Sequence, residues 1–349
     1  MQLSDKNIDA SLIKFANVTI SAENYVCVRE EAQKTIAIVD LKSKSSPTRL
    51  PIAADSAIMN PVSKVVALRA GGHLTMYSLE MKAKMSQATI AGTIVYWKWI
   101  DPKTVAIVTT DSVFHWSLEG AGEPVKMFDR TPHDSPVQVI NYFATPDGKW
   151  LMLSGLSVDA NKNFNGVLQV YSVDARASQP TLNAPAATFA HTQLDNKEAK
   201  SNIFAFCRKD PATGTYTLQM LELGVPKETA FSKQAPMRFA DAADFPMNMV
   251  ADPKYGILYV MSQQGFVFAY EIQSGKPIFA SRASQVTLFA VAPHSEDGCV
   301  AIDLKGRVVH FALDKANAVP YICNTMRDLD LGVQLARRYN LDGADHLFK

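Results

Sequence analysis

Two lysines that follow an alternating strand are the residues whose types and spacing best suit a specific chemistry. In the strand-like run that ends at Leu79, alternation sends Thr75, Tyr77 and Leu79 to one face. Lys82 and Lys84 lie just beyond, so they share that face if the extended backbone continues. An apolar strip that ends in two ammonium groups suits an extended peptide with hydrophobic residues followed by an acid. The alternative is that both lysines are solvated on an edge strand, where lysine discourages aggregation.

Recognisable catalytic and metal-binding patterns are missing from the sequence. The 7 histidines stand singly, without HxH, HExxH or HxxEH spacing. No GxSxG, GxGxxG or GxxxxGK[ST] motif occurs. Residues distant in sequence can still build an active site, so these absences lower the expectation of an enzyme without removing it. We expect a protein that is not an enzyme and that has no cofactor and no bound metal.

The overall composition excludes several other classes of protein. The chain has 349 residues, and 35 basic side chains almost balance 34 acidic ones, which argues against a nucleic-acid partner or direct binding to an anionic membrane. No apolar run approaches the roughly 18 to 20 residues of a membrane span, and the first residues lack the features of a signal peptide. The 4 cysteines form no CxxC pair and are expected to be buried, reduced thiols. We expect a cytoplasmic protein.

One hairpin pattern recurs along the chain, and it predicts the fold. Each copy has a β-rich run, a turn and a second alternating run, and the copies begin at Tyr25, Lys64, Thr104, Trp150, Asn202, Gly256 and Gly298. This spacing matches the ~40 to 50 residues of a four-stranded propeller blade rather than the ~8 to 12 residues between turns of a sandwich. Residues 1–322 are therefore predicted to form an all-β, seven-bladed β-propeller.

After the last hairpin, the hydrophobic pattern changes to a helical period. The run 324–341 puts Leu329, Val333 and Ala336 on one stripe, with acidic residues early and basic residues late, as the helix dipole favours. Residues 323–349 are expected to be α-helical and to begin a longer helical linker or solenoid. The alternative is a helix that packs back on the propeller as a cap. Under the first interpretation, the 349 residues are a fragment of a longer protein.

Several sequence blocks resemble the amino-terminal domain of the clathrin heavy chain. They are ADSAIMNP (54–61), EMKAKM (80–85), WKWI (97–100), PVKMFDR (124–130) and QVINY (138–142). The similarity continues through GVLQVYSVD and the final helix, so it covers essentially the whole chain. The resemblance implies a seven-bladed propeller followed by the first helices of the linker to the leg. This agrees with the hairpin count, which was obtained independently.

The resemblance also implies function, partners and location. It implies a vesicle coat protein in clathrin-mediated endocytosis and intracellular transport, on the cytosolic face of coated pits and coated vesicles. The propeller would bind adaptor and accessory proteins that carry LΦxΦ(D/E) motifs and reach the membrane only through them. Other heavy chains and light chains would bind regions outside this segment, and nucleic acid is not expected. The alternative is a propeller-fold enzyme or an unrelated interaction scaffold.

The family's main peptide site lies in the groove between the first two blades. The matching positions in this chain are Val66, His73, Thr75, Tyr77, Leu79, Lys82 and Lys84. His73 stands where the family usually has threonine, Thr75 where glutamine is usual, and Tyr77 where phenylalanine is usual. Both lysines are retained, so the end that binds the acidic residue is expected to persist.

The groove's arginine is displaced in this chain. Leu50 occupies its position, and Arg49 lies one residue earlier. A displacement of one residue in a strand moves a side chain to the other face. Either Arg49 reaches the groove through a local irregularity, or the lysines alone bind the acidic group, less directionally than a guanidinium fork would.

Two further family sites map onto the chain. The second, which takes tryptophan-containing peptides, corresponds to Phe15, Gln138, Ile140 and Leu156. Phe15 and Ile140 lie in apolar strand patterns, so a place in the core is the alternative for both. The third groove, between blades 4 and 5, accepts an arrestin-type motif. Gln179 is retained there, and Arg176 stands beside Ala175, where the family's arginine is expected.

The amino-terminal end also differs from the family pattern. Family members normally begin with further residues, including a strand that helps to close the last blade on the first. The start at Met1 therefore leaves open how the ring closes. It also leaves open whether a groove forms between the last two blades.

Overall fold

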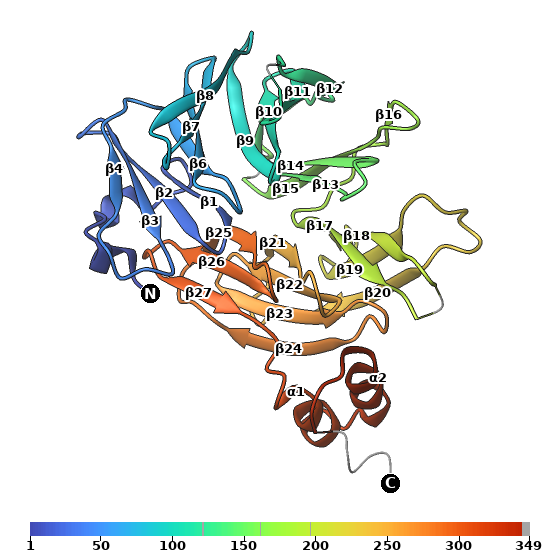
Figure 1. Cartoon of the computed structure of the whole chain (residues 1–349). Helices are drawn as coiled ribbons and strands as arrows, with labels where there is room; N and C mark the ends of the chain where they lie inside the picture. The colour runs from blue at the N-terminus through green and yellow to red at the C-terminus, as the bar shows by residue number, and fades with distance from the viewer. Residues whose placement is uncertain (121, 161, 196, 344–349) are drawn as a thin grey trace.

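The computed structural model of the chain describes residues 1–120, 122–160, 162–195 and 197–343. Within these residues, the strands form seven antiparallel sheets, arranged as blades around a central axis (Figure 1). In the same described ranges, six sheets have four strands and one has three, and each sheet uses strands that are consecutive in sequence. The prediction of an all-β, seven-bladed propeller followed by helices is confirmed.

The first four blades occupy the chain up to residue 178. Blade 1 contains β1 (Val18–Ala22), β2 (Tyr25–Glu30), β3 (Thr35–Asp40) and β4 (Thr48–Leu50). Blade 2 contains β5 (Ser56–Met59), β6 (Val65–Ala70), β7 (His73–Ser78) and β8 (Ala83–Thr89). Blade 3 contains β9 (Ile94–Asp101), β10 (Thr104–Thr109), β11 (Ser112–Ser117) and β12 (Val125–Asp129). Blade 4 contains β13 (Val137–Ala144), β14 (Trp150–Val158), β15 (Phe164–Ser172) and β16 (Ala177–Ser178).

Three more blades complete the ring. Blade 5 contains β17 (Ala187–Gln193), β18 (Lys200–Lys209), β19 (Tyr216–Glu222) and β20 (Ser232–Met237). Blade 6 contains β21 (Pro246–Ala251), β22 (Ile257–Ser262), β23 (Phe266–Glu271) and β24 (Pro277–Arg282). Blade 7 contains β25 (Leu288–Pro293), β26 (Cys299–Asp303) and β27 (Val308–Phe311). Short 3₁₀ helices span Leu3–Lys6 and Ala10–Leu12, and the carboxyl-terminal helices are α1 (Ala318–Pro320), a π-helical turn (Tyr321–Thr325) and α2 (Leu329–Tyr339).

The hairpins predicted from the sequence are the second and third strands of each blade. Their strands are rich in apolar residues on both faces, as in β22, where every side chain is buried. Both faces are apolar because each blade packs between two others, and the hydrophobic clusters run from one blade to the next. The first strands of neighbouring blades contact one another around the whole ring, including β1 with β25. The 4 cysteines are buried and unpaired, as expected.

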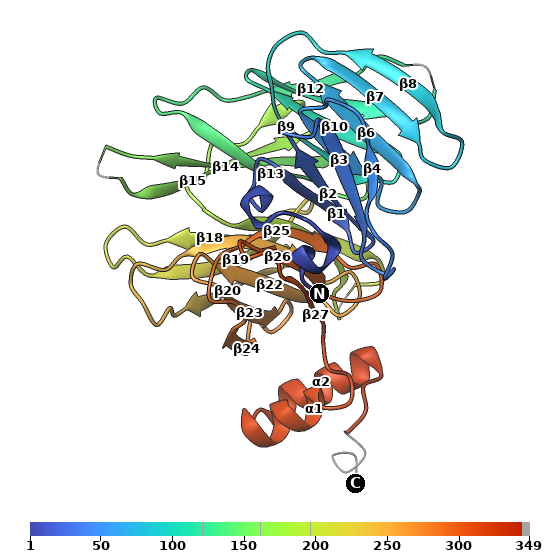
Figure 2. The same cartoon turned by 90° about the vertical axis from the view of Figure 1, so that its left-hand side faces the viewer.

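The residues at the start of the chain close the ring. Gln2 forms an antiparallel bridge with Arg307, and the Leu3 amide donates to the Gly306 carbonyl at 2.9 Å. Leu3 is fully buried in a cluster shared by blades 1 and 7. Figure 2 shows the amino terminus beside β27. The closure that the family comparison left open is thus provided by an extended segment that pairs with the free edge of β27.

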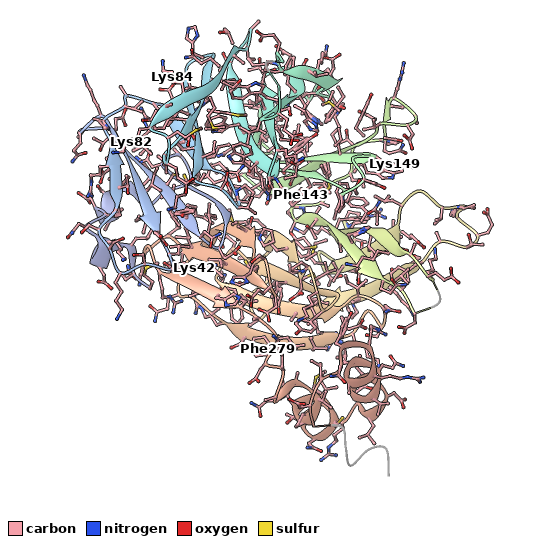
Figure 3. The ribbon with its side chains drawn as sticks, viewed as in Figure 1. Lys42, Lys82, Lys84, Phe143, Lys149 and Phe279 are labelled. Atoms are coloured by element: carbon pink, nitrogen blue, oxygen red, sulfur yellow. The ribbon has the colours of Figure 1, made fainter. Side chains whose placement is uncertain are left out.

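Blades 6 and 7 also enclose a cavity of about 420 Å³ with α1. Its lining is mostly apolar and includes Tyr259, Ile278, Phe279, Phe311 and Tyr321. Phe279, labelled on β24 in Figure 3, is 49% exposed. A hollow between the last two blades is therefore present, which the sequence comparison had left open.

The carboxyl-terminal helix packs back on the propeller. Leu331, Leu335 and Ala336 are buried in the cluster that contains core residues of blades 6 and 7. The predicted stripe was partly wrong, because Leu329 is 55% exposed. Asp328 caps the helix by accepting from the Leu331 amide, so Leu329 takes the first helical position and points outward. The described part of this helix therefore packs against blades 6 and 7, and the start of a longer helical linker stays a prediction.

An ion-pair network holds this helix in place. Arg338 binds Asp195 through two nitrogens, at 2.7 and 2.8 Å, and Glu271 at 2.8 Å. The Glu271 side chain is only 1% exposed and that of Arg338 is 11% exposed. A guanidinium held by two carboxylates in this geometry forms strong, directional bonds.

We predict that Arg338→Met lowers the free energy of unfolding by about 2 kcal/mol, because it leaves the buried Glu271 without its cation. Urea denaturation of the whole chain measures the loss. Arg337→Met is the matched control, since Arg337 is exposed on the same helix and should change stability by less than about 0.5 kcal/mol. Equal effects of the two substitutions would contradict this account of helix docking.

Candidate functional site

The face of blade 2 that is turned toward blade 1 forms an apolar surface. Alternation in β6 and β7 places Val66 and Tyr77 on this face, where they pack with residues of blade 1. We call the half-buried part of it the blade 1–2 surface, formed by Leu50, Ile52, Tyr77 and Leu79. It is the apolar strip that the sequence predicted.

The predicted contact residues differ in their access to solvent. Val66 is fully buried beside Tyr77, its partner across the strands, so it supports the surface and is not itself accessible. Thr75 is partly buried, and its Oγ1 accepts from Gln87 Nε2 at 3.4 Å. His73 is exposed at the start of β7. The structure thus corrects the assignment of Val66 as a contact residue.

The two lysines do not lie on one continuous strand. Lys84 belongs to β8 and is the partner of Tyr77, whereas Lys82 has a φ of +52° in the turn between β7 and β8. The backbone is therefore not extended at Lys82, and the prediction that both lysines follow on one strand face does not hold there. In Figure 3, Lys82 lies on the side of blade 2 nearer to β4, and Lys84 lies on β8. Among the described residues, no ion pair occupies either ammonium group.

Arg49 lies on the opposite face of β4 from the blade 1–2 surface. Its Nε and Nη2 each donate to a Glu30 carboxylate oxygen at 2.9 Å, and Nη2 also reaches the Asn7 carbonyl. Burial opposes ionisation of Glu30, but hydrogen bonds from Arg49 and Thr35 outweigh it and lower the pKa of this carboxyl. Leu50 faces the surface instead. The assignment of Arg49 to the groove is therefore wrong, and the lysines are the cations beside this surface.

The second predicted site forms part of a large cavity at the end of the ring where the innermost strands begin. The cavity has a volume of about 670 Å³, and Phe15, Gln138 and Ile140 line it. Phe15 is 41% exposed, so it is not a core residue. Leu156 is the cross-strand partner of Gln138 but does not line the cavity. We call this hollow the channel cavity.

The third predicted site lies at the outer edge of blade 4. Arg176 and Gln179 flank the short strand β16, and both side chains are exposed. Arg176 adopts a φ of +51°, which turns the chain into β16. The Gln179 amide donates to the Val170 carbonyl. The two residues therefore lie near each other on an edge strand.

The sequence did not predict Ile52 on the blade 1–2 surface or Lys98 in the channel cavity. Ile52 lies two positions after Leu50 and shares its face, so alternation could have identified it. Lys98 lines the channel cavity from an innermost strand, between Trp97 and Trp99. A lysine flanked by two tryptophans in an apolar run was the available signal.

Lys98 is held in an apolar environment. Burial lowers the pKa of its ammonium group to about 8. The Nζ atom donates to Asn141 Oδ1 at 3.0 Å and lies 5.1 Å from the centre of the Phe143 ring. An amide oxygen and a ring face stabilise a cation only in part, so the desolvation cost persists.

One cluster of possible metal ligands occurs in the described residues, on blade 7. His294, Asp297 and His310 have ligand atoms within 4.8 Å of one another. Each already has protein partners. His294 Nδ1 accepts from the Glu296 amide, His310 Nε2 contacts the Asp297 carbonyl, and Asp297 pairs with Lys315 at 3.0 Å. The arrangement is thus accounted for without an ion.

Comparisons with known proteins identify the family. Across all of its length, the chain is 38% identical to the probable clathrin heavy chain 1 of Caenorhabditis elegans and 36% identical to the clathrin heavy chain of Drosophila melanogaster. It is 37% identical to clathrin heavy chain 2 of Homo sapiens over 99% of its length. The chain spans 21% of each of these relatives. Residues 316–338 match the family model described as "Clathrin, heavy-chain linker".

Solved structures support the fold alone. The chain resembles the Kuenenia stuttgartiensis hydrazine synthase with a TM-score of 0.58 and 11% identity, covering 88% of this chain and 97% of that one. It resembles the β-propeller domain of Myceliophteria thermophila Cps50 (Swd1) with a TM-score of 0.51 and 9% identity, covering 84% of this chain and 97% of that one.

The sheets define a seven-bladed β-propeller with an apolar surface between blades 1 and 2. The chain is a homologue of the clathrin heavy chains over its whole length. The family of its relatives confirms the expectation that it is not an enzyme. No helix in the described part of the chain has the length and apolar character needed to cross a bilayer.

We predict that Lys98→Met stabilises the fold by about 1 to 2 kcal/mol at pH 7, because it removes a half-buried charge whose pKa desolvation lowers. The pKa of Lys98 is lower in the folded state than in the unfolded state. At pH values between the two, the unfolded state therefore binds the proton more tightly. The penalty in the natural protein is therefore full below pH 8 and disappears as the pH rises toward about 10.5.

Urea denaturation at pH 7 and at pH 10 measures this difference between the variant and the natural protein. The difference in the free energy of unfolding between Lys98→Met and the natural protein should be smaller at pH 10 than at pH 7. Lys84→Met, at an exposed position on β8, is the control and should leave the free energy of unfolding within about 0.5 kcal/mol at both values. A gap that is absent at pH 7, or that does not change with pH, would show that Lys98 carries no desolvation penalty.

Proposed function

We propose that this propeller is the adaptor-binding domain of a vesicle coat protein. It captures extended LΦxΦ(D/E) motifs at the blade 1–2 surface and so links the coat to cargo adaptors on the cytosolic face of coated pits and vesicles. The observation that carries this proposal is an apolar surface next to two lysines that have no acidic partner in the described structure. Homology to the clathrin heavy chains supports it. Heavy-chain and light-chain contacts belong to parts of the protein outside this segment.

Apolar contacts supply most of the binding energy in this proposal. Leu50, Ile52, Tyr77 and Leu79 would receive the hydrophobic side chains of the motif, at about 0.8 kcal/mol for each buried methylene group. The lysines would pair with the acidic residue and fix the direction of the peptide, and salt would weaken this term. Each contact is weak, but many propellers in one lattice bind strongly through effective concentration.

The leucine at position 50 makes this site differ from the family's usual groove. An arginine would offer a planar fork to the carboxylate, whereas lysine presents a point charge. In this chain, the face that would carry the arginine carries an apolar side chain. We therefore expect this site to accept peptides whose acidic residue varies in position. We also expect the hydrophobic residues of the peptide to contribute more to its selection.

The other two sites are proposed as weaker peptide sites. Phe15, Gln138 and Ile140 would take a tryptophan-containing peptide at the rim of the channel cavity, where an exposed aromatic ring and an amide lie together. Arg176 and Gln179 would take an acidic, arrestin-type motif along the edge of blade 4, because both are exposed beside β16.

We expect the double substitution Lys82→Glu with Lys84→Glu to lower the affinity for an LΦxΦ(D/E) peptide at least tenfold, because the acidic residue then meets like charges. Fluorescence titration of the labelled peptide measures the affinity, and thermal unfolding checks that the fold is intact. The double substitution of Lys126 and Lys149 to glutamate, on blade 3 and before β14, is the charge-matched control. Unchanged affinity in the Lys82 and Lys84 variant would remove the site.

We predict that Leu50→Arg tightens binding of the same peptide about fivefold, since residue 50 faces the blade 1–2 surface and a guanidinium can bind the carboxylate with two bonds. Arg49→Met serves as the control. It should leave peptide affinity unchanged while lowering stability, because Arg49 binds Glu30 on the other face. Loss of peptide affinity in Arg49→Met would show that Arg49 contributes to the peptide site after all.

A further inference from the structure

The walls of the channel cavity carry a concentration of positive charge. Arg29 of β2, Arg69 of β6 and Lys98 of β9 line it, and the single carboxylate in the described lining is Asp55. Three cations and one carboxylate give this lining a formal charge of +2, whereas the whole chain has a net charge of +1. The cations come from three consecutive blades, so no local sequence motif contains them.

Arg69 has an unused hydrogen-bond donor. Its Nη1 donates to the Ile94 carbonyl at 2.6 Å, but its Nε is buried without a partner in the described structure. Asp55, the nearby carboxylate, accepts from the Gly71 amide at 2.7 Å. Burial lowers the pKa of Arg69, and the charge of Arg29 lowers it further, against the opposing effect of Asp55. The Nε atom is buried away from solvent, so Arg69 contributes positive charge to the cavity wall rather than a free donor to a ligand.

Lys98 has spare donors as well. Its ammonium group can donate three hydrogen bonds, and among the described protein atoms one acceptor is Asn141 Oδ1 at 3.0 Å. That oxygen also accepts from the Tyr96 hydroxyl at 3.3 Å. In the described part of the chain, no carboxylate forms an ion pair with Lys98. The lysine is therefore a half-buried cation whose remaining N–H groups lack a counter-charge in the described structure.

The cations lie along the wall of the cavity rather than only at its mouth. Arg69 is the cross-strand partner of Ser56, the first residue of β5. Lys98 lies four residues after Ile94, the first residue of β9, which is roughly 13 Å further along an innermost strand. The rim residues Phe15 and Gln138 lie at the end where these strands begin. A ligand that reaches Lys98 must therefore be narrow enough to enter the ring.

We propose that the channel cavity binds a small, multiply charged anion of the phosphate class, with Lys98 as its ligand and with Arg29 and Arg69 as supporting cations nearer the mouth. A volume of about 670 Å³ lies within the usual range of small-molecule sites. Arginine and lysine together are the typical donors to phosphate oxygens. This site differs in residues and in ligand from the tryptophan-peptide site at the rim, and it does not depend on the proposed function.

Calorimetric titration of the whole chain with inorganic pyrophosphate at pH 7 and low salt tests the proposal. The expected result is saturable binding of one pyrophosphate per chain. Lys98→Met should weaken it at least tenfold, Arg69→Gln should weaken it less, and Arg69→Lys should restore part of the affinity lost in Arg69→Gln. Thermal unfolding shows whether each variant is folded, and Lys98→Met is expected to be the more stable one.

Two controls make the outcome decisive. The Lys82→Met and Lys84→Met double variant removes two cations from the blade 1–2 surface and should bind pyrophosphate as the natural protein does. Equal weakening in that variant would show non-specific charge attraction and would overturn the site. Absence of pyrophosphate binding, or binding of a tetra-aspartate peptide in its place, would overturn the choice of a phosphate-class ligand.

Discussion

Backbone pairing between the start of the chain and the last blade is the constraint on which the rest of the structure depends. The Leu3 amide and the Gly306 carbonyl join the ends of a ring whose blades otherwise follow one another along the sequence. Closure fixes blade 1 against blade 7 and so sets the angle between all neighbouring blades. The blade 1–2 surface and the channel cavity are both made by neighbouring blades, and neither would keep its geometry in an open ring. Burial of Leu3 supplies the hydrophobic part of this closure.

The blade 1–2 surface and the channel cavity differ in how exposed their positive charges are. The cations beside the blade 1–2 surface are exposed, so their attraction for an acid is weak, screened by salt and easily reversed. The cations of the channel cavity are half-buried, and burial lowers the pKa of Arg69 and of Lys98. Exposed lysines suit a contact that must form and dissolve many times. Half-buried cations that line one cavity suit a ligand that stays in place.

Strand alternation predicted some side-chain directions correctly and others not. It assigned Leu50 and Arg49 to opposite faces, as the structure shows, because β4 is regular there and pairs in register with β3. It failed at Lys82, where a left-handed turn residue breaks the extended backbone. It also misplaced part of the helical stripe, since the cap at Asp328 fixes where the helix begins and therefore which face meets the blades. The predictions succeeded where the backbone repeats and failed where a single residue ends the repeat.

The sequence by itself determined the blades, because each hairpin depends on contacts between residues close in the chain, and the spacing of seven such hairpins indicates a propeller. It also carried the family resemblance and the apolar strip of β7. Only the tertiary structure decided that Val66 lies beneath the surface, that the first residues close the ring, and that Arg29, Arg69 and Lys98 line one cavity. These facts depend on packing between blades whose residues are far apart in sequence. A local sequence pattern cannot predict which residues of different blades lie close together.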